Sequence, residues 1–181
     1  VTIVLAIGLQ KMVKRHAIIK KLHAVETLGS ITVICSDKTG TLTQNEMTIT
    51  QIYTDKKIYS VSGRGYNPTG EFTLDGSKVM PENDIHLKLL LTIGALCNDS
   101  KLEESGLDGG EKTWKIIGDP TEGAFIVAAA KAGIHTEDLL KIQPRLQEIP
   151  FDSDRKRMTT FHPLNNGKVA YIKGAPDVML N

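Results

Sequence analysis

The sequence lacks the short motifs of the commonest phosphate-binding and dinucleotide-binding folds. It contains neither a Walker A loop nor a GxGxxG, so P-loop and Rossmann dinucleotide chemistry are unsupported. Its 22 basic and 21 acidic residues leave a net charge of +1, which gives no indication of a nucleic-acid partner. It also lacks an internal repeat or a low-complexity tract, and its length and ordinary composition suit one domain or two small ones.

Cysteine is scarce, with only Cys35 and Cys97 in 181 residues. The pair shows neither CxxC nor Cys/His spacing, which argues against a disulfide framework and a zinc site. Because both residues have apolar neighbours in the sequence, we expect reduced, structural thiols.

The amino terminus begins with an uninterrupted apolar run, residues 1–9 (VTIVLAIGL). A bilayer span needs about 20 apolar residues, so this run cannot cross a membrane alone. It has no basic segment before it and no cleavage site, which makes it a poor signal peptide. A buried helix is one interpretation. The other is the cytoplasmic end of a membrane helix, because a basic cluster follows at once: Lys11, Lys14, Arg15, Lys20 and Lys21.

Two segments with different sequence patterns follow this run. Residues 31–35 (ITVIC) are β-branched and non-alternating, which predicts a strand covered on both faces in a parallel sheet, with a site at its carboxyl end. After Thr43 the pattern changes to mixed helices and antiparallel strands, so we place a domain boundary at residues 44–47. Polar, glycine-rich residues 62–70 and 100–110 are predicted to be loops.

The segment after Thr43 is predicted to contain several helices and strands. Strands are expected over residues 46–53, 57–61 and 112–117, and an antiparallel hairpin over 157–162 and 169–173 with Asn-Asn-Gly in its turn. An apolar helix is expected over residues 85–96, with Asn83 and Asp84 as capping candidates. A second helix should run from Pro120 to residue 131, with Asp119 as its N-cap.

The segment with the clearest chemistry is residues 35–43 (CSDKTGTLT). A carboxylate placed just beyond a buried strand and followed by small residues and glycine could lie where backbone N–H groups surround a phosphoryl group. Asp37 is then a candidate nucleophile, since carboxylates can carry covalent intermediates, and Lys38 with Mg²⁺ could supply positive charge. The alternative is that Asp37 only caps the following turn.

A second candidate segment is residues 151–158 (FDSDRKRM). Phe151 precedes five charges in six residues, which is a poor place for a core side chain and a good one for a platform under an aromatic base. Lys173 ends a strand and would ordinarily be solvated, but Gly174 behind it would let a ligand approach the backbone.

These segments carry a family resemblance. CSDKTGTLTQNEMT resembles, residue for residue, the phosphorylation signature of P-type ATPases, and residues 15–34 (RHAIIKKLHAVETLGSITVI) are similar to the linker that leads from the fourth transmembrane helix in their type II, calcium-pump-like branch. The resemblance implies that Asp37 is phosphorylated and that its carboxylate and the carbonyl of Thr39 bind Mg²⁺. Thr39 stands where related haloacid-dehalogenase-type phosphatases have a second aspartate that transfers protons. Threonine cannot do this at neutral pH, so its presence would slow breakdown of the phosphoenzyme.

The same resemblance implies an ATP site. It gives Phe151 a stacking role under the adenine, makes Lys156 a contact to the nucleotide and places Lys173, with Gly174, deep in the pocket. Met158 should line the pocket, and Glu122, within GDPTE, should lie near the adenine. Capping of the helix by Asp119 and Glu122 is an equally good interpretation, and both can hold.

One position departs from the family pattern. Ser153 stands where calcium pumps usually have arginine, which removes an expected phosphate contact. Arg155 is the candidate replacement, although in an extended segment its side chain would face the opposite way.

The expected fold is α/β and α+β. Residues 1–10 should be the end of a transmembrane helix, and residues 11–45 a linker and the start of a Rossmann-like, haloacid-dehalogenase-type phosphorylation domain. Residues 46–181 should be a truncated nucleotide-binding domain with a mostly antiparallel sheet and flanking helices.

The function expected from the resemblance is ATP-driven cation transport, with Ca²⁺ as the ion and the intact protein in a membrane. The fragment itself should be catalytically incomplete. Two alternatives are a soluble nucleotide-binding module that never catalyses and a dehalogenase-type phosphatase. The apolar start and the intact CSDKTGT argue against the first, and Thr39 argues against the second.

Overall fold

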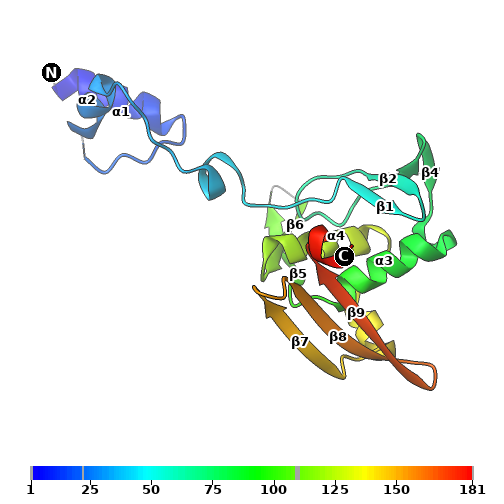
Figure 1. The fold of residues 1–181 in the computed structure, drawn as a ribbon. Coiled ribbons are helices and arrows are strands. Elements are labelled where there is room, and N and C mark those ends of the chain that lie inside the picture. The colour runs from blue at the N-terminus through cyan, green and yellow to red at the C-terminus, as the bar shows by residue number, and fades with distance from the viewer. Residues whose placement is uncertain (1, 22, 109–110, 181) are drawn as a thin grey trace. The chain divides into compact units, whose positions relative to one another are not determined.

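A computed structural model describes residues 2–21, 23–108 and 111–180. Expectations that include Val1, residue 22, residues 109–110 or Asn181 lie outside the described residues at those positions. The chain divides into two compact units, Val1–Gln44 and Asn45–Asn181, beside the boundary predicted at residues 44–47 (Figure 1).

The first unit contains two helices and a turn. Helix α1 spans Thr2–Val13, α2 spans His23–Ser30 and the turn η1 spans Lys38–Leu42. The apolar run is therefore helical from Thr2 onward. Among the described residues, no helix has the length and apolar character needed to cross a bilayer.

The strand predicted at residues 31–35 is wrong. These residues form no strand, and the side chains of Val33 and Ile34 are 74% and 77% exposed. A strand of this type depends on neighbouring strands for its backbone hydrogen bonds, and within the described part of the chain none pairs with this segment. Cys35 is consequently exposed, whereas Cys97 is buried, and both carry free thiols.

The second unit has three antiparallel sheets around a helical layer (Figure 1). The first sheet is a meander, β1-β2-β3-β4, and β5 pairs only with β6, while β7-β8-β9 form the third sheet. The strands are β1 (Gln51–Thr54), β2 (Lys57–Val61), β3 (Phe72–Leu74), β4 (Ser77–Val79), β5 (Lys101–Asp108), β6 (Glu111–Ile117), β7 (Gln147–Asp152), β8 (Arg157–Leu164) and β9 (Gly167–Gly174).

Of the helices of this unit, the two that the sequence predicts, over residues 85–96 and from Pro120 to residue 131, are confirmed. The 3-10 turn η2 spans Pro81–Asn83, and the helices are α3 (Ile85–Leu96), α4 (Pro120–Lys131), α5 (Thr136–Ile142) and α6 (Pro176–Met179). The Asp84 carboxylate accepts hydrogen bonds from the backbone N–H groups of His86 and Leu87, so it caps α3. The hairpin β8-β9 is also confirmed, and it turns at Asn165, which has a φ of 50°.

Several predictions about the second unit need correction. The strand predicted from residue 46 begins only at Gln51. The predicted loop at residues 100–110 is strand β5 over Lys101–Asp108, which forms an antiparallel ladder with β6. Several of its cross-strand side chains are charged and exposed, including the ion pairs Lys112–Glu104 and Lys115–Glu103, so the segment lacks the apolar alternation that predicts a strand.

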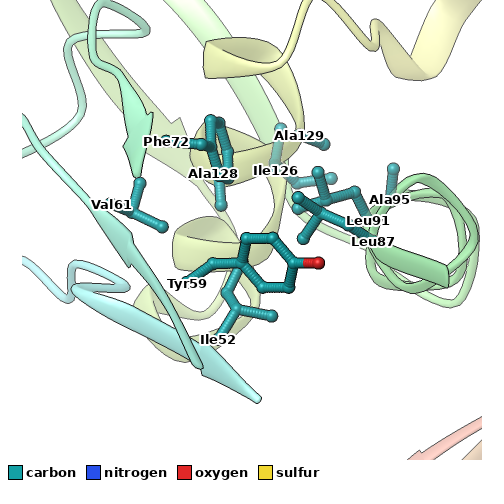
Figure 2. Close-up of a cluster of buried hydrophobic side chains, with 10 residues drawn as sticks. All are labelled: Ile52, Tyr59, Val61, Phe72, Leu87, Leu91, Ala95, Ile126, Ala128 and Ala129. Atoms are coloured by element: carbon teal, nitrogen blue, oxygen red, sulfur yellow. The ribbon is translucent and has the colours of Figure 1, made fainter. Parts of the chain in front are cut away.

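The main core lies between the first sheet and helices α3 and α4. Residues of three strands and two helices contribute to it: Ile52, Tyr59, Val61, Phe72, Leu87, Leu91, Ala95, Ile126, Ala128 and Ala129 (Figure 2). A smaller cluster of Leu96, Cys97, Met158 and Tyr171 joins the end of α3 to the third sheet. Helices α3 and α4 thus pack on the first sheet, and the end of α3 also packs on the third.

Candidate functional site

The Asp37 segment forms a single turn in the first unit. The Asp37 carboxylate accepts a hydrogen bond from the backbone N–H of Thr39 at 3.3 Å, and the turn closes where the Thr43 N–H donates to the Lys38 carbonyl at 3.0 Å. Gly40 has a φ of 75°, a conformation that disfavours residues with a Cβ. Asp37 therefore caps this turn, and its exposed carboxylate remains accessible to a ligand.

The first turn of α4 carries Glu122. Asp119 is confirmed as the N-cap, with its carboxylate accepting from the N–H groups of Thr121 and Glu122 at 2.8 and 3.2 Å. Burial acts to raise the pKa of Asp119, but these hydrogen bonds and the charge of Lys173 outweigh it and hold the pKa below its usual value.

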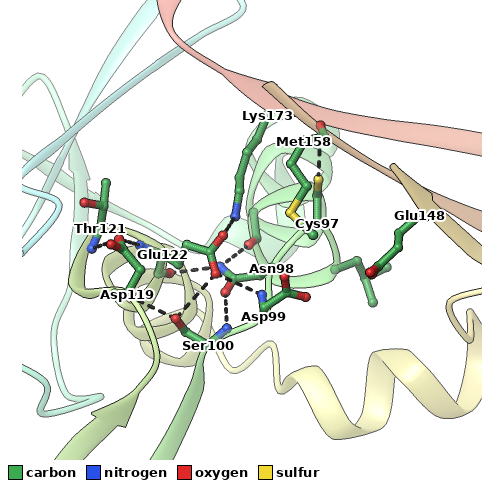
Figure 3. Close-up of polar contacts among 12 residues, drawn as sticks. Cys97, Asn98, Asp99, Ser100, Asp119, Thr121, Glu122, Glu148, Met158 and Lys173 are labelled. Carbon is green, nitrogen blue, oxygen red and sulfur yellow. Dashed lines mark hydrogen bonds and ion pairs between the residues drawn. The ribbon is translucent and has the colours of Figure 1, made fainter. Parts of the chain in front are cut away.

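Glu122 and Lys173 form an ion pair between α4 and β9, 51 residues apart in the sequence (Figure 3). Each side chain is only 19% exposed. Charges withdrawn from water to this extent interact more strongly than surface pairs, and each depends on its partner. Lys173 is thus not a merely solvated lysine at the end of a strand.

The turn after α3 also donates hydrogen bonds to Glu122. The N–H of Asp99 donates to Glu122 Oε2 at 3.0 Å, and the Asn98 amide donates to the carbonyls of Glu122 and Gly94 at 2.9 and 3.0 Å (Figure 3). Asn98 Oδ1 also accepts from the N–H of Ser100 at 2.9 Å. The Glu122 carboxylate is therefore fixed by a backbone donor on one oxygen and an ammonium on the other.

The FDSDRKRM segment is a strand end followed by a tight turn. Phe151, in β7, is 62% exposed, which agrees with its predicted place outside the core. Asp152 caps the turn, its carboxylate accepting from the N–H groups of Asp154 and Arg155 at 3.0 and 2.9 Å. Lys156 adopts a φ of 51°, and its ammonium lies 4.0 Å from Asp177. Phe151 and Lys156 thus present an aromatic face and an exposed cation.

Arg155 does not lie in an extended segment, as one interpretation of the sequence supposed. It belongs to the turn, and one guanidinium nitrogen donates to the Thr159 hydroxyl at 3.4 Å. A second nitrogen, Nη1, is buried without a hydrogen-bond partner. This side chain is directed toward the sheet, so the structure gives no support to Arg155 as the replacement for a phosphate contact at Ser153.

Packing in the second unit shows where two further predicted site residues lie. Met158 is 1% exposed and belongs to the cluster with Leu96, Cys97 and Tyr171, so it lies beneath the surface instead of lining it. A Cβ on Gly174 would lie 2.8 Å from the carbonyl oxygen of Lys156. The space beside Gly174 is therefore filled by the chain itself, and close packing of β9 on the turn explains this glycine without a ligand.

Sequence reasoning missed Asp99 and Arg145 at this site. Arg145 lies between α5 and β7, and its guanidinium donates to the Asp99 carboxylate at 2.6 Å and to the Asn98 carbonyl at 2.5 Å. An arginine in a connecting segment has no local signature. Only the tertiary structure brings it to the turn after α3.

The sequence profile of the P-type ATPase cytoplasmic domain N matches residues 86–181, which is more than half of the chain. The chain belongs to the P-type ATPases. It is 49% identical to the cation-transporting ATPase pma1 of Synechocystis sp., over 99% of this chain and 20% of that protein. It is 44% identical to a calcium-transporting ATPase of Bacillus subtilis, over 99% of this chain and 20% of that protein. The calcium-transporting ATPase 1 of Lactococcus lactis is 43% identical over the whole chain and 18% of its own length.

The chain therefore spans about a fifth of the length of these curated relatives. The matched residues of this P-type ATPase chain include α4, with Glu122, and the three-stranded sheet, with Phe151 and Lys173. The mixed helices and antiparallel sheets of the second unit agree with the fold expected for a nucleotide-binding domain.

Proposed function

We propose that the intact protein is an ATP-driven cation pump that forms an aspartyl phosphate at Asp37. The Asp37 carboxylate would attack the γ-phosphorus of ATP, forming an O–P bond while the bond to the β-phosphate oxygen breaks and ADP leaves. The observation that carries the proposal is the accessible Asp37 carboxylate at the head of a glycine-containing turn, in a chain of the P-type ATPase family.

The residues around Asp37 fit a magnesium ion in part. Mg²⁺ takes oxygen ligands and usually binds one or two carboxylates together with phosphate oxygens and water. Asp37 and the carbonyl of Thr39 are oxygen donors of this kind, and the described residues contain no cluster of three or more acidic, histidine or cysteine side chains. Mg²⁺ held there would supply positive charge to the phosphoryl oxygens, and Lys38 would add to it.

We place the ATP site on the second unit, at Glu122, Phe151, Lys156, Lys173 and Gly174. Phe151 offers an exposed aromatic face for the adenine, and Lys156 offers an exposed ammonium for phosphate. Gly174 contributes by letting β9 pack on the turn that carries Lys156. The residues before Asn45 would be the cytoplasmic end of a membrane helix, a linker and the start of a haloacid-dehalogenase-type phosphorylation domain.

A titration of the 181-residue chain with MgATP tests the nucleotide site. The backbone amides of Phe151, Lys156 and Lys173 should shift in NMR spectra. Phe151→Ala should lower affinity by about 1 to 3 kcal/mol, the range for loss of one base-stacking side chain. If none of these amides moved at saturating ATP, the site would be wrongly placed.

Calcium is the ion we propose, because two of the similar proteins are named calcium-transporting ATPases. Phosphorylation of the intact protein by ATP should then require Ca²⁺ at micromolar to millimolar concentration, as an obligatory activator. If another cation activated and Ca²⁺ did not, the choice of ion would be wrong while the pump itself would stand.

A further inference from the structure

Arg145 connects two parts of the second unit that the proposed site needs to hold together. Its Nη1 atom donates to the carboxylates of Asp99 and Glu148, both at 2.6 Å. Its Nη2 atom donates to the carbonyls of Asn98 and Leu96 at 2.5 and 3.4 Å. One guanidinium therefore contacts four acceptors from the turn after α3 and from strand β7.

The bonds from Arg145 to the carbonyls of Leu96 and Asn98 lie at the carboxyl end of helix α3. The last carbonyls of a helix lack intrahelical partners, and α3 ends at Leu96. Arginine near the end of a helix can donate to these groups and interact favourably with the helix dipole. Burial acts to lower the pKa of Arg145, but its bonds to Asp99 and Glu148 raise it, so the group remains cationic.

The same turn holds the Glu122 carboxylate. Asp99, whose side chain is bound by Arg145, donates its backbone N–H to Glu122 Oε2 at 3.0 Å. Asn98, whose carbonyl is bound by Arg145, donates its side-chain amide to the Glu122 carbonyl at 2.9 Å. Both routes from Arg145 to Glu122 pass through a single intermediate residue.

Through Glu148, the same guanidinium also contacts the strand that carries Phe151. Glu148 is the second residue of β7, and Phe151 follows three residues later on the same strand. Figure 3 shows Glu148 beside the turn that carries Asp99, with Glu122 and Lys173 beyond it. The contacts of Arg145 therefore join the strand of Phe151 to the turn that holds Glu122.

We infer that Arg145 is a positioning residue for the nucleotide site, acting through Asp99 and Asn98 on Glu122 and through Glu148 on β7. The inference rests on the proposed function, since it assigns a residue to the proposed ATP site. Arginine suits the role because its planar fork can donate in several directions at once. A lysine ammonium is a compact charge that cannot span the carboxylates and carbonyls with the same geometry.

The test is a titration of the 181-residue chain with the non-hydrolysable analogue AMP-PNP and Mg²⁺. Arg145→Ala should weaken binding about tenfold, the factor that corresponds to 1.4 kcal/mol. Lys141→Ala is the matched control, because Lys141 also forms an ion pair, with Asp138, but its side chain is 74% exposed. The control should bind within about twofold of the unchanged chain.

A double-mutant cycle separates positioning from a general loss of structure. If Arg145 acts through Glu122, Arg145→Ala should weaken binding much less in a Glu122→Ala background than alone. Equal weakening in both backgrounds would show that Arg145 only stabilises the fold and would overturn the inference. Arg145→Lys, which keeps the charge, gives the same comparison if the alanine variant does not fold, and it should still bind more weakly than the unchanged chain.

The outcomes also distinguish this inference from the proposed function. If Phe151→Ala weakens binding and neither Arg145 variant does, the role of Arg145 is overturned and the nucleotide site stands. If the unchanged chain fails to bind AMP-PNP, or if Phe151→Ala binds as tightly as the unchanged chain, the proposed site is wrong and the role of Arg145 falls with it.

Discussion

Asn98 should be among the most important polar side chains for the stability of the second unit. It is 6% exposed and makes three hydrogen bonds, to the carbonyls of Gly94 and Glu122 and from the N–H of Ser100. A neutral hydrogen bond contributes about 1 kcal/mol net, so Asn98→Ala should cost about 3 kcal/mol of unfolding free energy. Helices α3 and α4 and Ser100, the residue before β5, lose their shared contact at once.

Urea unfolding followed by the fluorescence of Trp114 measures this loss. Trp114 is the only tryptophan, and it is half-buried in β6 of the second unit, so its emission reports on that unit. For a slope of about 2 kcal/mol per molar urea, the midpoint should fall by roughly 1.5 M. Asn98→Asp should be no less destabilising at pH 7, because a carboxylate would face two carbonyl oxygens.

Asn67→Ala is the control for this measurement. Asn67 also accepts a hydrogen bond through its side chain, from the N–H of Thr69 at 3.0 Å, but it lies on an exposed loop. We expect a change within about 0.5 kcal/mol, which is usual for surface substitutions. A loss below 1 kcal/mol for Asn98→Ala, or equal losses for the two variants, would refute the reasoning.

Three further predictions concern packing and charge. Leu87→Ala in α3 should cost about 2 to 5 kcal/mol because Leu87 is fully buried, whereas Leu89→Ala, 47% exposed on the same helix, should cost far less in the same urea assay. Gly174→Ala should cost about 1 to 3 kcal/mol of unfolding free energy, because its Cβ would lie 2.8 Å from the Lys156 carbonyl oxygen. Gly167→Ala is the control and should be almost neutral, because the nearest atom to its Cβ is 3.9 Å away. Equal losses of stability in the two variants would contradict this prediction. Hydrogen bonds from the Tyr59 hydroxyl and the backbone N–H of Leu87 lower the pKa of Asp84 from 3.8 to about 2. The ionised Asp84 carboxylate should therefore stabilise the fold above pH 4, and this stabilisation should be lost as the pH falls through 2. The stability difference between the unchanged chain and Asp84→Asn should therefore shrink across that interval, and a constant difference would show that Asp84 is not the titrating group.

The sequence predicted those elements whose signals are local. Asp84 and Asp119 mark the starts of α3 and α4 because a capping side chain acts on its own first turn. The hairpin β8-β9 follows from two apolar strands and an Asn-Asn-Gly turn. By contrast, β3 and β4 are three residues each, too short for a period to be seen, and β5 carries exposed charged side chains in place of an apolar alternation.

The site was harder to predict than the helices because its contacts are long-range. The motifs identified Glu122 and Lys173 singly, but their pairing depends on how β9 lies against α4. The burial of Met158 could not be predicted either, because a motif does not say which face of its strand is buried. Arg145 could not have been found, since its four acceptors come from segments that meet only in the folded unit.

Phosphorylation of the intact protein tests the central claim most directly. Incubation with ATP labelled on the γ-phosphate should yield an acid-stable phosphoprotein that hydroxylamine cleaves, as expected for an acyl phosphate. Asp37→Asn should abolish the label, because the carboxamide is not a nucleophile for phosphoryl transfer, while ATP binding to the second unit persists. Survival of the label in that variant would contradict the account.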